Sequence, residues 1–381
     1  MLSPQELLDN FNRLNIPTEE EIIANWIDPT ETPKVSVLCI TYNHKPYIED
    51  ALKGFLIQKT NFPFEIIIHD DASTDGTSDI IRDYAYRYPK LIKTIIQKEN
   101  LYSQGISRNK YVNPLLTADY IALCEGDDFW IDEKKLQTQC DISTGFFEPS
   151  LLISPFLFKT NESLSISNNL GNNIKKISVQ EILSNKGGPL GQTASYFMNK
   201  EIYFKVNTIF PKRPIGDLFL EVIASLEGKL IYYPKIFTLY RYAVPGSWSL
   251  QNFESKEKAD TYKTFIDRME YTIKESRKHK LYSDLNWDPI LSFYYYRLAE
   301  YYLEEKKYRD FKTSICKNYH LKDQSLRQKI IYYFRNNIFL LKIILPTYDF
   351  FKKILKKTSS TNKYIIDFFS SGTKNKEKNY S

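Results

Sequence analysis

The stretch KVSVLCITYNHKPYIEDALKGFLIQKTNFPFEIIIHD, residues 34–70, contains two apolar runs with an amphipathic segment between them. Residues 34–42 and 64–70 are rich in Val, Ile and Phe, which is typical of buried strands. Residues 48–58 have apolar side chains at helical spacing. A strand, a helix and a second strand in this order predict one β–α–β unit of an α/β fold.

The same alternation continues to residue 124. Helical patterns at 77–88 and about 107–117 alternate with strand patterns at 91–97 and 119–124. Strands and helices at this spacing indicate a mixed, mostly parallel sheet with helices on both faces, a Rossmann-like arrangement.

Polar clusters follow three of these strands: TYNH at 41–44, HDDAST at 69–74 and EGDD at 125–128. Ligands of such sheets bind beyond the carboxyl ends of the strands, so the clusters converge on one rim if the strands are neighbours. Each cluster also fits a structural role, as a strand exit, a helix N-cap or a solvated turn. The crowded carboxylates of EGDD repel one another unless a cation, a proton or water compensates them, which leaves a metal site or a solvated turn.

Length and composition indicate a globular protein. The 381 residues exceed the usual size of one core, so we expect two domains or one domain with an appendage. The four cysteines form no CxxC pair, which predicts a reducing compartment and no structural zinc site. The N-terminus has no leader pattern, and no run of about 20 apolar residues follows, so we expect a cytoplasmic location.

The net charge of +6 is distributed unevenly. Residues 301–381 contain 18 Lys and Arg against 7 Asp and Glu, whereas residues 1–300 contain 34 against 39. The basic character therefore belongs to the C-terminal part. We expect no nucleic-acid partner, because this part lacks a recognised nucleic-acid-binding motif.

The ordered motifs of residues 34–140 resemble those of the family 2 glycosyltransferases. The stretches that carry the resemblance are VSVLCITYNHKPYIEDALKGFLIQ, FEIIIHDDASTDGTSDIIRDYA and ENLYSQGISRNKYVNPLLTADYIALCEGDDFW. The resemblance implies the GT-A fold of nucleotide-diphospho-sugar transferases. It implies two sets of nucleotide-binding residues. The nucleoside would be bound by Thr41, Tyr42, Asn43, Asp70 and Asp71. The diphosphate would lie near Gly105, Arg108 and Asn109.

The resemblance also assigns EGDD to the DxD-type metal motif of the family. Glu125 stands where the family often has Asp, so we place the metal chiefly on Asp127, with Glu125 and Asp128 as support. The diphosphate leaving group gains negative charge as the glycosidic bond breaks. A hard divalent cation, Mn²⁺ or Mg²⁺, neutralises that charge.

Beyond residue 142 the resemblance weakens, but IGDLFLEVIASLEGKL at 215–230 predicts a helix that opens at Asp217. Inverting members of the family often have a carboxylate base at the start of such a helix, which implies that Asp217 is catalytic. The alternative is a plain N-cap. The helix N-terminus is expected to lower the pKa of Asp217.

The segment FTLYRYAVPGSWS at 237–249 resembles the one that closes over the donor in related sequences. Two residues here are possible donor or acceptor contacts. Arg241 either contacts a phosphate or pairs with a surface acid, and Trp248 either stacks on a sugar or belongs to the core.

The rest of the chain reads as helical. We expect an N-terminal helical extension at 1–33, a glycosyltransferase domain at 34–250 with nucleotide-sugar (34–140) and acceptor (141–250) halves, a helical region at 251–357, and a disordered basic tail at 358–381. Residues 324–357 interleave aromatic and aliphatic with basic residues, which is typical of an interfacial helix at an anionic membrane. The alternative is a helix docked on the protein itself.

These inferences predict a metal-dependent, inverting glycosyltransferase. It would move a sugar from a nucleotide-sugar donor, UDP-linked, to a hydroxyl of a glycan or lipid-linked saccharide in surface polysaccharide synthesis, at the inner face of the cell membrane. The alternative is a non-catalytic scaffold that keeps the fold and only binds a nucleotide or a membrane. A nucleotidyltransferase is disfavoured, because TYNHKPY supplies no Gly-rich, Lys-bearing loop after the first strand.

Overall fold

The computed structural model of the chain describes residues 2–145, 147–185, 188–245, 247, 250, 258–321 and 324–350. The chain forms two compact units, Met1–Ile290 and Leu291–Ser381. The tail at 358–381, which the sequence predicts to be disordered, lies outside the described residues.

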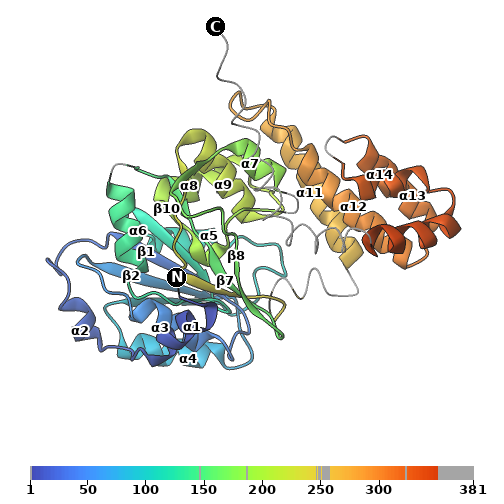
Figure 1. Cartoon of the computed structure of the whole chain (residues 1–381). Helices are drawn as coiled ribbons and strands as arrows, with labels where there is room; N and C mark the ends of the chain where they lie inside the picture. Colours follow the sequence, from blue (N-terminus) through green and yellow to red (C-terminus); the bar gives the residue numbers. More distant parts are fainter. Residues whose placement is uncertain are drawn as a thin grey trace, which may run out of the picture. The chain divides into compact units, whose positions relative to one another are not determined.

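An eight-stranded sheet runs through the first unit (Figure 1). Its strands lie in the order β3 (Ile92–Ile96), β2 (Phe64–Asp70), β1 (Val35–Thr41), β4 (Tyr120–Glu125), β10 (Phe197–Asn199), β6 (Leu151–Ile153), β11 (Leu230–Tyr232) and β9 (Lys175–Ile177). The first four strands are parallel, and β10 is antiparallel to both of its neighbours. The expected α/β fold with a mixed, mostly parallel sheet is confirmed.

Helices cover both sides of this sheet, with α3 (Ile48–Leu56) and α4 (Thr77–Arg87) on one side and α8 (Lys200–Ile209) and α9 (Gly216–Glu227) on the other (Figure 1). The apolar side chains of α3 are fully buried, which fixes its orientation. A Cβ on Gly54 of this helix would lie 2.8 Å from the Trp130 carbonyl oxygen. Only glycine allows so close an approach between α3 and the strand that contains Trp130.

The sequence predicted a helix at 107–117, and this prediction is wrong in the length and the type of the helix. Helix α5 covers only Asn109–Val112, and a 3₁₀ turn, η1 (Asn113–Leu115), follows it. Pro114 has no N–H to donate to the carbonyl of Lys110, and continuing an α-helix through such a position costs about 3 kcal/mol or more. Helices α6 (Lys135–Thr144), α7 (Val179–Ser184) and α11 (Lys258–Ser276) also belong to this unit, as does a second 3₁₀ turn, η2 (Thr193–Ser195).

A smaller sheet contains β5 (Phe129–Trp130), β12 (Thr238–Arg241), β7 (Phe156–Lys159) and β8 (Leu164–Ser167), in this order. Helix α1 (Pro4–Arg13) packs beside it, since the Phe11 ring lies 4.8 Å from the Phe129 ring. In α2 (Glu19–Ile23), the Glu19 carboxylate accepts hydrogen bonds from the backbone N–H groups of Lys90 and Leu91 at 2.7 and 3.1 Å. Both N-terminal helices are therefore part of the first unit.

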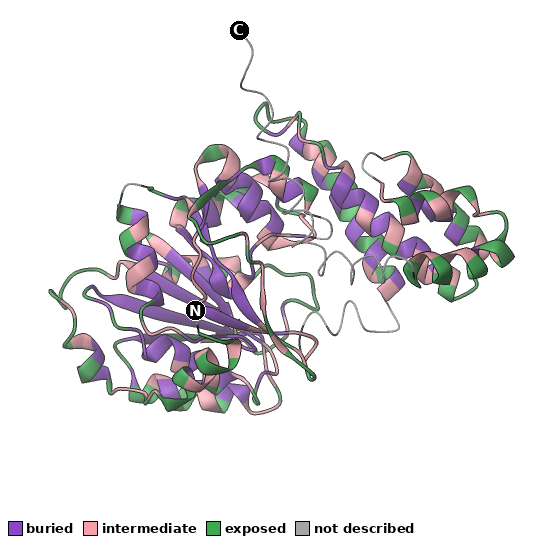
Figure 2. Cartoon of the chain, in the orientation of Figure 1, coloured by how far each residue is buried: buried purple, intermediate pink, exposed green. Residues whose placement is uncertain are grey.

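The central strands are buried along most of their length, as Figure 2 shows. In β2 every residue is buried, from Phe64 to Asp70. A strand buried on both faces is typical of a parallel sheet covered by helices. This burial fixes the strands whose carboxyl ends carry the polar clusters.

The second unit is helical. It contains most of α12 (Asp288–Glu304), then α13 (Tyr308–Tyr319), α14 (Leu326–Tyr333) and a final helix at residues 338–350. Among the residues that the structure describes, no helix combines the length and the apolar character that crossing a membrane requires.

Candidate active site

The parallel register brings the three polar clusters to one rim of the main sheet. Thr41, the last residue of β1, is paired with Asp70 of β2, and Ile40 is paired with Glu125 of β4. The ladder continues past the strand ends, because the Asp71 N–H donates to the Thr41 carbonyl at 3.0 Å and the Gly126 N–H donates to the Ile40 carbonyl at 2.9 Å. The loops that follow β1, β2 and β4 therefore form one continuous surface.

The turn after β4, residues 125–128, concentrates negative charge; we call it the acidic turn. Carboxylate oxygens of Glu125, Asp127 and Asp128 all lie within 4.8 Å of one another. A Cβ on Gly126 would lie 2.5 Å from Thr41 Oγ1 and 2.9 Å from His44 Nδ1. Because glycine has no Cβ, the acidic turn can pack closely against the loop after β1.

Asp128 is the inner carboxylate of the acidic turn, and its oxygens are already engaged. Gln192 Nε2 donates to Oδ2 at 2.5 Å, and the backbone N–H of Arg241 donates to Oδ1 at 2.9 Å. Burial, together with the charges of Asp127 and Glu125, raises the pKa of Asp128 well above its usual range. Asp128 thus holds the turn in place from within.

Glu125 and Asp127 differ from Asp128, because no donor among the described residues forms a hydrogen bond to either carboxylate. His44 Nε2 lies 3.8 Å from Asp127 Oδ2, and burial lowers the pKa of this histidine. Burial and the negative charges of Asp127 and Asp217 raise the pKa of Glu125 to about 8.

The donor set of the acidic turn fits a hard divalent cation. Two carboxylates have free oxygens, which are the ligands that Mn²⁺ and Mg²⁺ prefer. Three buried polar atoms beside them, Thr41 Oγ1, His44 Nδ1 and Gln192 Oε1, have no hydrogen-bond partner among the described residues. Buried polar atoms without a partner are uncommon and indicate a missing ligand, ion or water.

The side chains that follow β1 and β2 make internal contacts. Asp70 accepts hydrogen bonds from the backbone and hydroxyl of Ser73 at 3.1 and 2.5 Å, and from the Ser78 hydroxyl. Asn43, at a positive φ of 55°, accepts a hydrogen bond from the Thr74 N–H at 2.8 Å and so ties the two loops together. These contacts shape the rim.

Asp71 fixes the loop after β3. Its two carboxylate oxygens accept hydrogen bonds from the backbone N–H groups of Leu101 and Tyr102 at 2.9 and 3.0 Å. Each oxygen keeps a second lone pair for a ligand. Tyr42 is half-buried on the same rim.

The loop with Gly105, Arg108 and Asn109 borders the acidic turn. Gly105 has a positive φ of 67°, which glycine adopts without strain. Arg108 is exposed, yet its positive charge lowers the pKa values of Glu125 and Asp217, against the larger effect of burial. Asn109 is half-buried, and its backbone N–H donates a 3.3 Å hydrogen bond to the Ser107 hydroxyl oxygen.

Asp217 is the second residue of α9 and not its cap. The N-cap is Ile215, which forms no side-chain cap. Thr193 Oγ1 donates a 2.7 Å hydrogen bond to Asp217 Oδ2. The expectation that the helix N-terminus lowers the pKa of Asp217 is wrong, because burial raises it and outweighs the favourable contacts of Thr193, Arg213 and Arg108.

Residues 190–196 connect the acidic turn to Asp217; we call this segment the bridging loop. Its Gln192 binds Asp128, and the next residue, Thr193, binds Asp217. Glu221 of α9 holds the loop, since it accepts hydrogen bonds from the N–H groups of residues 190 and 191 at 2.8 and 2.6 Å and from the Tyr196 hydroxyl at 2.7 Å. Burial raises the pKa of Glu221 to about 7.

Arg241 is engaged by the protein itself. Its guanidinium forms an ion pair with Asp50 and donates to the Asp127 carbonyl at 2.7 Å, and it stacks 4.4 Å from the Phe129 ring. The sequence left two roles for Arg241, a phosphate contact or a pairing with a surface acid. The structure shows the pairing, with Asp50. Trp248, the other residue expected here, lies outside the described residues.

Comparison with known proteins agrees with this geometry. Residues 36–141 match the family described as glycosyl transferase family 2. This matched segment includes the acidic turn, and within it the chain resembles the family 2 glycosyltransferases.

The chain is similar to several other proteins over part of its length. An uncharacterized protein of Mycobacterium tuberculosis is 32% identical over 225 residues, which cover 56% of this chain and 60% of that protein. TuaG of Bacillus subtilis, whose name assigns it provisionally to teichuronic acid biosynthesis as a glycosyltransferase, is 34% identical over 127 residues, 32% of this chain and 47% of that protein. The chain therefore spans less than two thirds of the length of these curated relatives.

Among solved structures, TarS 1–349 of S. aureus in complex with UDP-GlcNAc has the same fold. It superposes with a TM-score of 0.51 at 19% identity, over 75% of this chain and 80% of that chain. This likeness supports the GT-A fold and, at this identity, the fold alone.

Sequence reasoning missed three side chains at the candidate site: Gln192, Thr193 and Glu221. The resemblance weakens beyond residue 142, where all three lie. One signal was available, because Glu221 follows Asp217 by one helical turn and therefore lies on the same face of α9. The partners of Gln192 and Thr193, 64 and 24 residues away, could be found only in three dimensions.

Proposed function

We propose that the protein is a metal-dependent, inverting glycosyltransferase that transfers a sugar from a UDP-linked donor to a hydroxyl of a glycan or lipid-linked saccharide. We place it in surface polysaccharide synthesis, in the cytoplasm at the inner face of the membrane. One observation carries the proposal: two adjacent residues of the bridging loop bind the acidic turn and Asp217, since Gln192 donates to Asp128 Oδ2 at 2.5 Å and Thr193 donates to Asp217 Oδ2 at 2.7 Å. A donor-side acidic cluster and an acceptor-side base thus share one site.

For the donor, we assign the nucleoside to the rim formed by Thr41, Tyr42, Asn43 and Asp71. Asp71 has lone pairs free to accept a hydrogen bond from a base N–H. Asp70 acts indirectly in this proposal, because Ser73 and Ser78 already engage it and it shapes the loop. The exposed cation of Arg108, with Gly105 and Asn109, would face the diphosphate.

Asp127 and Glu125 would hold the metal ion, Mn²⁺ or Mg²⁺, because their oxygens have no other donor among the described residues. Asp128 supports them from within the turn through Gln192 and Arg241. When bound, the ion supplies positive charge to the diphosphate as it departs.

On the acceptor side, Asp217 would take the proton of the attacking hydroxyl. Thr193 occupies Oδ2, which leaves Oδ1 to receive that proton. A pKa raised by burial brings the carboxylate closer to neutral pH, where a general base is most effective. Attack from the side opposite the diphosphate then inverts the anomeric configuration.

The comparisons support the choice of donor and pathway. The solved TarS structure contains UDP-GlcNAc, and the name of TuaG refers to teichuronic acid biosynthesis. UDP-linked donors and a cell-surface polymer are therefore the first substrates to test.

The test measures donor hydrolysis and transfer by the purified protein across a panel of nucleotide sugars, with and without Mn²⁺ or Mg²⁺. We expect metal-dependent turnover of a UDP-sugar. Asp127→Ala should abolish it and leave the unfolding temperature unchanged or higher, because removing one carboxylate relieves repulsion in the acidic turn. Asp260→Ala, which removes an exposed acid of α11, is the matched control and should keep full turnover.

Two outcomes would contradict this proposal. Undiminished turnover by the Asp127→Ala protein would overturn the metal assignment. Nucleotide binding by calorimetry without turnover of any donor would favour the non-catalytic scaffold.

A further inference from the structure

The final helix, residues 338–350, has an apolar outer ridge formed by Phe339, Leu340, Ile343 and Phe350. The exposed fractions of these residues are 74%, 36%, 51% and 62%. Phe339, Ile343 and Phe350 are separated by four and seven positions, a spacing that puts them on one face of a helix. A contiguous group of exposed large apolar side chains marks an interaction surface.

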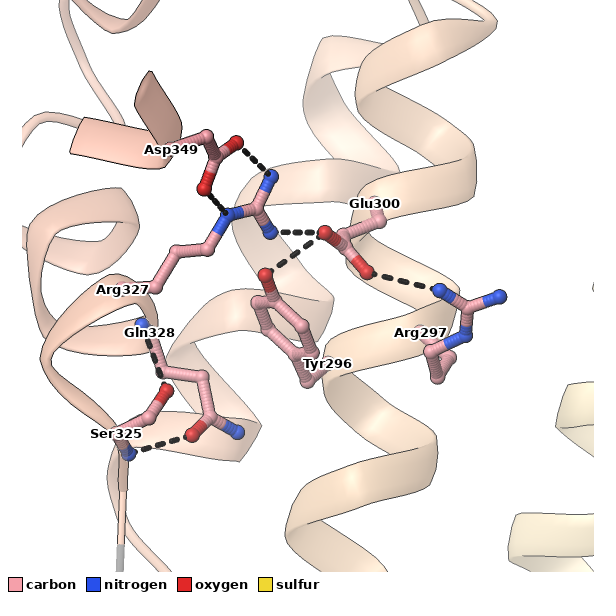
Figure 3. Close-up of polar contacts among 7 residues, drawn as sticks. All are labelled: Tyr296, Arg297, Glu300, Ser325, Arg327, Gln328 and Asp349. Atoms are coloured by element: carbon pink, nitrogen blue, oxygen red, sulfur yellow. Dashed lines mark hydrogen bonds and ion pairs between the residues drawn. The ribbon is translucent and has the colours of Figure 1, made fainter. Parts of the chain in front are cut away.

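The opposite side of the final helix is fixed to the rest of the second unit. Leu341 is buried, and Asp349 accepts a 3.1 Å hydrogen bond from Arg327 Nε of α14. Figure 3 shows the Arg327 guanidinium between the carboxylates of Asp349 and Glu300. Because these contacts set the rotation of the helix about its axis, the outer ridge has to face away from them.

The elements that carry this ion-pair network are themselves well anchored. Glu300 of α12 also accepts hydrogen bonds from the Tyr296 hydroxyl at 2.7 Å and from Arg297 at 3.2 Å. In α14, Ser325 and Gln328 form a capping box, and Gln328 Nε2 also donates to the Ser292 hydroxyl of α12 at 3.2 Å (Figure 3 shows the capping box). The orientation of the outer ridge is therefore built into the unit.

The charge around the outer ridge selects its partner. Lys342 lies between ridge residues on the final helix, and Lys329 of α14 is also exposed. Residues 324–381 contain twelve Lys and Arg against three Asp and Glu. A second copy of this chain would bring like charges together, whereas an anionic lipid surface complements them.

We propose that the outer ridge is the membrane-docking surface of the protein and that its partner is an anionic lipid bilayer. The ridge side chains enter the boundary between headgroups and acyl chains, and the lysines meet the headgroups. The described part of the helix is roughly 20 Å long at 1.5 Å per residue. This described part is shorter than the hydrocarbon core of about 30 Å, and in this proposal it lies in the interface.

This surface refines the membrane location included in the proposed function, and turnover of the sugar donor tests that function separately. The docking test uses the full-length protein in flotation with vesicles of phosphatidylcholine, alone or mixed with phosphatidylglycerol. We expect binding to the anionic vesicles only, weakened by salt, because exposed charges are screened.

The double variant Phe339→Asp, Ile343→Asp should lose at least about tenfold in vesicle affinity, because two apolar anchors become acids. Lys342→Glu should lose about thirtyfold, since each unit of charge near the surface contributes about 1 kcal/mol and this change alters the charge by two units. Ile27→Asp is the matched control, since Ile27 is 82% exposed in the first unit, and its affinity should not change.

Circular dichroism should show that the double variant unfolds close to the wild-type temperature, since Phe339 and Ile343 are 74% and 51% exposed. Vesicle binding equal to wild type in the folded double variant would overturn the proposal. So would a wild-type protein that ignores anionic vesicles, in particular if sedimentation shows that the double variant converts a dimer into a monomer. Donor hydrolysis that persists in that case would leave the proposed function standing.

Discussion

At the scale of single residues, neighbouring carboxylates of the acidic turn have different roles because they have different hydrogen-bond partners. Asp127 and Asp128 are adjacent carboxylates, but the oxygens of Asp128 accept hydrogen bonds from Gln192 and from the backbone of Arg241. Removing Asp128 would therefore leave two buried donors unpaired, a loss of structure. The Asp127 carboxylate accepts no hydrogen bond from the described residues. Its substitution therefore tests metal binding with less effect on the fold.

The residue-scale prediction concerns Asp217. Asp217→Asn keeps the shape and can still accept the Thr193 hydrogen bond, but it cannot take a proton. Losing a general base typically costs about 10²- to 10⁴-fold in rate. We expect transfer to fall by this factor while UDP affinity, measured by calorimetry with Mn²⁺, stays within about twofold.

The matched variant is Thr193→Val, which removes only the hydrogen bond to Asp217 Oδ2. Because that bond lowers the pKa of Asp217, its loss should move the acidic limb of the transfer–pH profile to higher pH. Near-normal transfer by Asp217→Asn would make Asp217 a structural residue, and an equal loss of transfer and UDP affinity would make it a donor ligand.

At the scale of elements, the bridging loop is a rigid connection between α9 and the acidic turn. Glu221 accepts from two loop N–H groups and from Tyr196, so three donors depend on one buried carboxyl group. The acidic turn and Asp217 are thus positioned by the same loop, through its neighbouring residues Gln192 and Thr193.

We predict that Glu221→Gln reduces kcat by about tenfold or more. The new amide N–H₂ faces a backbone N–H, and one buried donor left unpaired costs about 1 to 3 kcal/mol. The loop should shift and misplace both Gln192 and Thr193. The measurements are kcat, KM and the free energy of unfolding of the variant.

The control is Glu227→Gln at the other end of α9. Glu227 pairs with Lys205 at 2.7 Å and contacts the Tyr282 hydroxyl, away from the bridging loop. It should lose stability but keep kcat. If both variants lose stability and both keep kcat, Glu221 only stabilises the fold and does not position the site.

At the scale of the whole molecule, a buried lysine links the stability of the fold to pH. Lys135, the first residue of α6, is fully buried, with Nζ 2.7 Å from Gln139 Oε1 and 4.1 Å from the centre of the Trp130 ring. Burial lowers its pKa from 10.5 to about 7. Between these values the unfolded chain binds a proton that the folded chain does not, so stability rises with pH.

We predict that raising the pH from about 7 to 9 stabilises the wild type relative to Lys135→Met by about 2 kcal/mol, since each pH unit contributes at most about 1.4 kcal/mol. Urea unfolding of both proteins at both pH values measures the difference, in which the other titrating groups cancel. An unchanged difference would contradict the prediction and show that the Trp130 ring keeps the ammonium group charged.

The sequence predicted the parallel part of the fold well, because strand and helix periods are local properties. The strands before TYNH, HDDAST and EGDD were recognised from consecutive residues, and the order of the motifs was enough to indicate the family. The prediction of a helix at 107–117 was wrong because it followed the apolar periodicity and did not take account of Pro114, which lies in a 3₁₀ turn. The short strands beyond residue 142 have too few residues for a clear pattern, and their pairing comes from the sheet.

By itself, the sequence determined which side chains end the strands of this protein and therefore which chemistry can occur at the rim. Only the tertiary structure decided their tasks: Asp70 and Asp128 accept hydrogen bonds within the protein, the Asp127 carboxylate accepts none from the described residues, and Asp217 is joined to the acidic turn through the bridging loop. The reason is that hydrogen-bond partners and burial depend on residues far apart in the chain, and these contacts set the charge and availability of each carboxylate.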